Sequence, residues 1–161
     1  MREIAEQDFT GNLFKLLAET FEGPPEQGAS AYLDKGAGLF QTLAKVTAAA
    51  ASHQPYPGST TIVAHVAHLD YYVRVLHNFI VGQDQTIDWE SSWQTQMMSA
   101  DEWDALKQRL QTGYSSLKQT LESVGRWGDE EVGDSMAIAV HTAYHLGALR
   151  QLLRFGQNRL R

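Results

Sequence analysis

Apolar residues recur every three or four positions along most of this 161-residue chain, which is the spacing of one face of an α-helix. The clearest stripe rises in steps of 3, 4, 4, 3 and 4 residues through Trp103, Leu106, Leu110, Tyr114, Leu117 and Leu121. No stretch alternates apolar with polar residues for long enough to indicate a β-strand. The sequence therefore predicts an all-α protein.

Five segments share this helical spacing, and helix-breaking or capping residues separate them. The predicted helices cover residues 4–21, 31–51, 59–80, 99–124 and 130–155. The clearest helix start is Ser99-Ala100-Asp101-Glu102, in which the serine can cap the third amide and the glutamate can reach back.

The stretch from Gly82 to Ser99 has no clear periodicity, and we expect it to form a long crossover loop. Helices of about 20 residues joined by one long crossover are the ingredients of an antiparallel four-helix bundle. We assign this bundle to residues 31–156 and an additional N-terminal helix to residues 1–22. Together they would form a single domain over residues 1–161.

Charge and cysteine content exclude several kinds of function. The chain has 13 basic and 19 acidic residues, a net charge of −6, which argues against binding to a nucleic-acid backbone. It has no cysteine, so disulfides, thiolate catalysis and Cys-ligated zinc are excluded, and metal ligands must be nitrogen or oxygen. Neither a basic leader nor an apolar stretch of membrane-spanning length is visible, so we expect a cytoplasmic protein without a membrane partner.

Four of the six histidines fall in two pairs on two predicted helices. His141 and His145 are four residues apart on an apolar helix face, so their rings can hold one metal ion between them. His65 and His68 lie on the third predicted helix. If the two helices are neighbours, one histidine from the third and two from the fifth would form a three-nitrogen site with open positions. Periodicity alone slightly favours His65 over His68, and the alternative is that all four are hydrogen-bonded core residues.

The residues around these histidines form two longer motifs. The run Thr61-Ile62-Val63-Ala64-His65-Val66-Ala67-His68-Leu69-Asp70-Tyr71-Tyr72 opens with Thr-Ile, reaches His68 seven residues later and has an aromatic residue four beyond it. The run His141-Thr142-Ala143-Tyr144-His145-Leu146-Gly147 has the form H-x-x-Y-H-x-G. In both runs the chain resembles the DinB/YfiT-like superfamily of bacterial metal-binding four-helix bundles. The resemblance implies His68, His141 and His145 as the metal ligands and leaves His65 as a rival or auxiliary ligand.

The resemblance also implies a function. Characterised relatives are metal-dependent transferases that activate low-molecular-weight thiols, or isomerases that use such thiols, so we expect a zinc or nickel ion and a small-molecule substrate. Because the chain has no cysteine, the thiol would arrive as a cosubstrate. The alternatives are a non-catalytic metal- or ligand-binding stress-response protein and a metal-dependent hydrolase, although no H-E-x-x-H motif is present. Asp70 and Tyr144 are possible outer groups of the site.

A homodimer is also expected. Relatives of this type are often homodimers, and the first predicted helix carries apolar surface beyond what a four-helix core requires, at Phe9, Leu13, Leu16, Leu17 and Phe21. This surplus would be covered either by the helix's own bundle or by a second copy of the chain.

Overall fold

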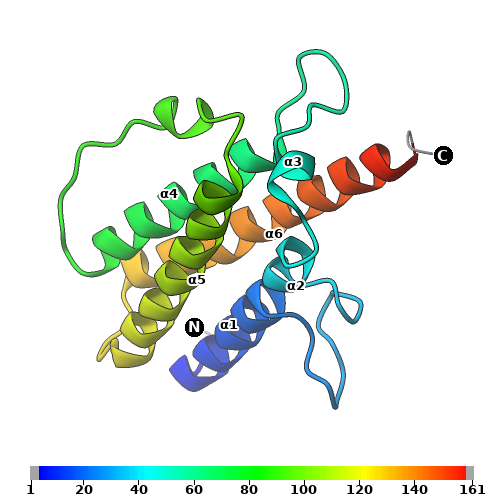
Figure 1. Cartoon of the computed structure of the whole chain (residues 1–161). Helices are drawn as coiled ribbons and strands as arrows, with labels where there is room; N and C mark the ends of the chain where they lie inside the picture. Colours follow the sequence, from blue (N-terminus) through cyan, green and yellow to red (C-terminus); the bar gives the residue numbers. More distant parts are fainter. Residues whose placement is uncertain (1–3, 159–161) are drawn as a thin grey trace.

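The computed structural model describes residues 4–158, and it is built from helices (Figure 1). In chain order these are α1 (Glu6–Phe21), α2 (Leu39–Leu43), α3 (Ala48–Ala51), α4 (Ile62–Ile80), the 3₁₀ turn η1 (Ser91–Trp93), α5 (Ala100–Ser123) and α6 (Asp129–Asn158). The described residues contain no strand, so the predicted all-α bundle is confirmed. The ends of the predicted domain, residues 1–3 and 159–161, lie outside the described residues.

Helix α4 lies between α5 and α6, and α1 packs against α6. Helices α4 and α6 run in opposite directions, as the bundle prediction requires (Figure 1). Helices α4 and α5 instead run parallel. This follows from two contacts between them: Asp70 pairs with Arg109, and further along both helices His77 hydrogen-bonds Thr120. The physical reason is the crossover predicted from Gly82 to Ser99. It is confirmed, with only the short turn η1 in it, and it returns the chain to the start of α4 before α5 begins (Figure 1).

The predicted helix over residues 31–51 is wrong, because most of this segment is loop with two short helices, α2 and α3. Its start is held in a non-helical path by Glu19 of α1, whose side chain is buried. The carboxylate accepts hydrogen bonds of 2.6, 2.7 and 2.6 Å from the backbone N–H groups of Ala31, Tyr32 and Leu33. Further along, Gly36 has a φ of +75°, which interrupts any helix there.

A close approach of two glycines fixes the path into α2. A Cβ atom on Gly38 would run into the backbone of Gly23, so only glycine fits at this crossing of the chain. Gly23 itself has a φ of +107°, which ends α1 with a turn that other residues rarely adopt.

Helix α1 is therefore the fourth long helix of the bundle, a role that the sequence analysis assigned to a helix over residues 31–51. It buries Leu13, Leu17 and Phe21, and the Phe21 ring stacks on Tyr114 of α5 at 4.3 Å. The predicted additional N-terminal helix is thus one of the four long helices of the bundle. Its apolar stripe is mostly covered by its own chain.

The stripe and the cap that the sequence predicted for α5 are both present. All six apolar residues of the stripe are buried, and burial of each such side chain stabilises the fold by about 1.5–3 kcal/mol. Ser99 caps the third amide while the Glu102 carboxylate accepts from the Ser99 N–H at 2.8 Å. No helix within residues 4–158 combines the length and the apolar character needed to cross a membrane.

Candidate metal centre

Three histidine side chains converge where α4 packs against α6. His68 comes from α4, and His141 and His145 come from successive turns of α6. The Nε2 atom of His141 lies 3.0 Å from Nε2 of His68 and 3.1 Å from Nε2 of His145. The structure thus brings together the three ligands that the resemblance implied, with one nitrogen of each within 4.8 Å of the others.

The donor set fits a divalent metal ion. Two nitrogens that each bind one zinc ion at about 2.0–2.1 Å lie about 2.9 Å apart at a right angle and about 3.4 Å apart at the tetrahedral angle. The observed separations of 3.0 and 3.1 Å fall inside this range. Three imidazole nitrogens are also a donor set that suits zinc or nickel.

A serine of the crossover fixes the protonation of His68. The Ser92 hydroxyl donates its one hydrogen to the carbonyl of Trp89 at 2.6 Å, so it accepts from His68 Nδ1, 2.7 Å away. With its proton on Nδ1, His68 directs the lone pair of Nε2 toward the other two histidines. This arrangement of an outer hydrogen-bond partner behind the ring is typical of metal-ligating histidines.

We expect Ser92→Ala to weaken metal binding about 10- to 100-fold, which is the usual cost of removing such an outer partner. The reason is that His68 would then be free to place its proton on Nε2 or to rotate. Competition with a chromophoric chelator measures the change. Ser91→Ala is the matched control, because the Ser91 hydroxyl hydrogen-bonds the Asp88 carbonyl and not a histidine. Wild-type affinity in Ser92→Ala would show that this contact does not orient the ligand.

His65 lies outside the group of converging nitrogens. Its Nδ1 is 2.8 Å from Nδ1 of His145, which is the nitrogen of His145 that faces away from the group. The contact allows His145 to keep its proton on Nδ1 and its lone pair on Nε2. The structure therefore gives His65 the position of an auxiliary residue behind His145, and the slight preference of periodicity for His65 as a ligand is not supported.

Burial keeps these imidazoles neutral. His68 is 5% exposed and His145 is 1% exposed. Burial, with a smaller contribution from the neighbouring histidines, lowers the pKa of His68 to about 4 and that of His145 to about 3. Burial also lowers the pKa of His141 and of His65. Neutral imidazoles carry the free lone pairs that a metal ion requires, so the group is in its ligand form at neutral pH.

Aromatic rings hold the histidines in place. Trp93 stacks on His68 at 4.1 Å, and Tyr72 stacks on His141 at 3.8 Å. Trp93 belongs to η1, so the crossover covers one side of the group. The sequence analysis assigned no role in the site to Ser92 or Trp93, since both lie in the crossover without periodicity, whereas Tyr72 was already the aromatic residue of the first motif. The available signal for the crossover residues was the pair of tryptophans within that segment, Trp89 and Trp93.

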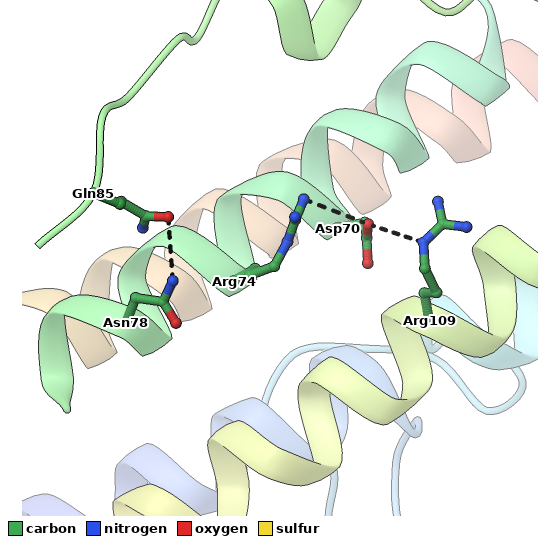
Figure 2. A network of polar contacts seen from close by, with 5 residues as sticks. All are labelled: Asp70, Arg74, Asn78, Gln85 and Arg109. Carbon is green, nitrogen blue, oxygen red and sulfur yellow. Dashed lines mark hydrogen bonds and ion pairs between the residues drawn. The ribbon is translucent and has the colours of Figure 1, made fainter. Parts of the chain in front are cut away.

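The two outer groups suggested by the sequence lie elsewhere. Asp70 faces α5, where its carboxylate pairs with Arg109 at 3.6 Å and with Arg74 at 4.0 Å (Figure 2). Tyr144 is 70% exposed, and its ring meets that of His145 in a T-shaped contact with the centroids 5.1 Å apart. Asp70 therefore links α4 to α5, and neither residue hydrogen-bonds a histidine of the group.

A helical bundle with three converging imidazoles between two of its helices defines a class of protein that can hold a metal ion in its core. Residues 33–149, which include all three histidines, match the family model of the DinB superfamily. The chain therefore belongs to the DinB superfamily. Comparisons with curated proteins and with solved structures found no match.

Proposed function

We propose that this chain is a metal-dependent enzyme in which His68, His141 and His145 hold one zinc or nickel ion. We further propose that it transfers a low-molecular-weight thiol to a small electrophilic substrate. The observation that carries the metal proposal is the convergence of three Nε2 atoms, two of them on rings whose far nitrogens are hydrogen-bonded. Membership of the DinB superfamily supports it.

The number of protein ligands favours a catalytic over a structural ion. A structural zinc is usually closed by a fourth protein ligand, whereas a catalytic zinc has three and an open position. The natural fourth candidate, His65, contacts the far side of His145 instead of joining the group. Within residues 4–158 the group contains three histidines and no carboxylate. A ligand from outside the chain could therefore complete the coordination.

The choice of a thiol follows the resemblance to relatives that activate small thiols, and the absence of cysteine agrees with it. A divalent cation held by neutral imidazoles would lower the pKa of a thiol bound to it, which is the chemistry that it supplies. The chain has no cysteine, so a thiol nucleophile would have to come with a substrate. Transfer forms a carbon–sulfur bond while the leaving group departs and the thiol proton passes to solvent, so no oxidant is required. Hydrolysis is less well supported, because the histidine group has no carboxylate to act as its general base.

A non-catalytic metal- or ligand-binding stress-response protein is the second candidate. The observation that favours it is the cover over the histidines, since Trp93 stacks on His68 and leaves that ring 5% exposed. An enzyme needs access for its substrates, and a binding protein does not. The two functions therefore differ in whether an outside thiol can reach the metal.

The experiment is a conjugation screen with metal-loaded protein, a panel of small thiols and a general electrophile. We expect turnover that varies with the thiol, stops on chelation and returns with added metal. Turnover that survives chelation would contradict the proposal. If loaded protein with stoichiometric metal conjugates no thiol in the panel, the binding-protein function replaces the enzyme. We place the activity in the cytoplasm, where small thiols are kept reduced.

We also propose that the chain forms a homodimer through the outer faces of α1 and α6. Ile4, Leu16, Met136 and Val140 are exposed around an apolar hollow of about 360 Å³ between these helices. Val140 is 68% exposed on the side of α6 that faces this hollow. A second copy of the same face would cover this surface.

For the dimer, we expect Val140→Glu to convert a species of twice the chain mass into monomers, because it would bury two carboxylates in the interface. Sedimentation velocity at micromolar concentration measures the change. Val81→Glu, at an exposed valine just beyond α4, is the control and should leave the dimer intact. A wild-type protein that sediments as one chain would contradict the proposal.

A further inference from the structure

A second site with the character of a ligand pocket lies away from the histidines. It is a cavity of about 530 Å³ between α3, the start of α4 and the end of α6. Its walls are largely apolar and include Val46, Ile62, Leu152 and Leu153. This volume and this lining are typical of sites for small molecules with an apolar body.

The cavity is separate from the metal centre. Leu152 lies seven residues after His145, two helical turns or about 10 Å along the axis of α6. Leu149 lies between them, is fully buried and does not line the cavity. A ligand in the cavity would therefore occupy a place of its own, and the inference does not depend on the proposed metal.

The ionisable groups at the cavity are basic. Lys45 and His53 are among the described residues that line it, and none of those residues is Asp or Glu. Both side chains are exposed at its rim. The Lys45 ammonium group has no ion-pair or hydrogen-bond partner among the described side chains. In a protein with a net charge of −6, an unpaired basic group over an apolar cavity is complementary to a ligand that is both apolar and anionic.

We propose that this cavity binds a small amphipathic carboxylate, with its hydrocarbon body between α3 and α6 and its carboxylate at Lys45. The apolar walls supply most of the affinity, and each methylene of the ligand should tighten binding about two- to fourfold until the cavity is full. The basic rim supplies the preference for an anion over a neutral molecule of the same shape. His53 lines the same cavity, and its ring N–H can donate a second hydrogen bond to the carboxylate.

The test is calorimetric titration of the full chain with octanoate and, as the neutral match, with 1-octanol. We expect one saturable octanoate site and about five- to tenfold weaker binding of the alcohol. Lys45→Gln should remove this difference without affecting the alcohol. Lys15→Gln, at an exposed lysine of α1 outside the cavity, is the matched control and should behave as wild type.

Two variants test the place of binding. Ala49→Trp and Ala50→Trp each put a large ring into the cavity from exposed positions on α3, so the fold should tolerate at least one of them. Whichever variant retains the wild-type circular dichroism spectrum should lose binding of both ligands. The proposal is overturned if wild-type protein shows no saturable octanoate binding, if the alcohol binds as tightly, or if a folded variant with a filled cavity binds octanoate normally.

Discussion

His68→Ala is expected to abolish stoichiometric metal binding, with an affinity loss of more than about 100-fold, beyond the usual cost of losing an outer partner. The reason is that its Nε2 is one of only three nitrogens that converge in the described part of the chain. His141→Ala and His145→Ala should behave alike. Equilibrium dialysis followed by metal analysis measures the bound ion per chain.

His65→Ala is the informative contrast to these variants. It removes the residue behind His145 and should weaken binding about 10- to 100-fold while leaving one ion per chain at saturating metal. His53→Ala, at an exposed histidine that is not part of the converging group, is the control and should leave metal binding unchanged. If His65→Ala abolishes binding and His68→Ala does not, the assignment of the ligand on α4 is wrong.

Glu19→Gln is expected to destabilise the fold by about 2–4 kcal/mol, a large part of the stability of a domain of this size. The buried carboxylate accepts three backbone N–H groups, two at Oε1 and one at Oε2. A glutamine must turn its NH₂ group toward one of these donors. Urea unfolding measures the loss. Glu26→Gln, at an exposed glutamate in the following loop, is the matched control and should cost little.

The effect of Glu19→Gln should depend on pH. Burial would raise the pKa of Glu19, but the three backbone hydrogen bonds outweigh burial and hold the pKa below its ordinary value of 4.5. A carboxyl group with a lowered pKa in the folded state contributes its stability above the unfolded pKa, and loses it as the pH falls through the folded pKa. The difference between wild type and variant should therefore be full at pH 7 and shrink in acid. A difference that stays constant down to strongly acidic pH would contradict a role for the charge.

The parts of the fold that depend on local sequence were predictable. Regular spacing predicted α5 and its buried stripe, and the residues of its cap predicted its start. The segment 31–51 was not predictable, because its path depends on hydrogen bonds to Glu19, 12 to 14 residues away, and on the contact of Gly38 with Gly23. Local helical preference is realised there only in two short helices.

The candidate site also has a part that local sequence predicts and a part that depends on tertiary packing. The four-residue spacing of His141 and His145 predicted that both rings face one neighbour, and this is what the structure has. The choice between His65 and His68 depends on how α4 is rotated against α6, which helical spacing alone does not determine. The contact of Ser92 with His68 could not be predicted, because it depends on how the crossover packs on α4 and no pattern in the crossover indicates it.

The most direct test of the central claim is X-ray absorption spectroscopy on untagged protein loaded with one equivalent of zinc or nickel. We expect one ion per chain, coordinated by three imidazole nitrogens, with the remaining positions filled by light atoms from outside the protein. Added thiol should introduce sulfur among these ligands if the proposed transfer is also correct. A spectrum without three imidazole ligands, or the same spectrum from a variant with His68, His141 and His145 all replaced by Ala, would contradict the central claim.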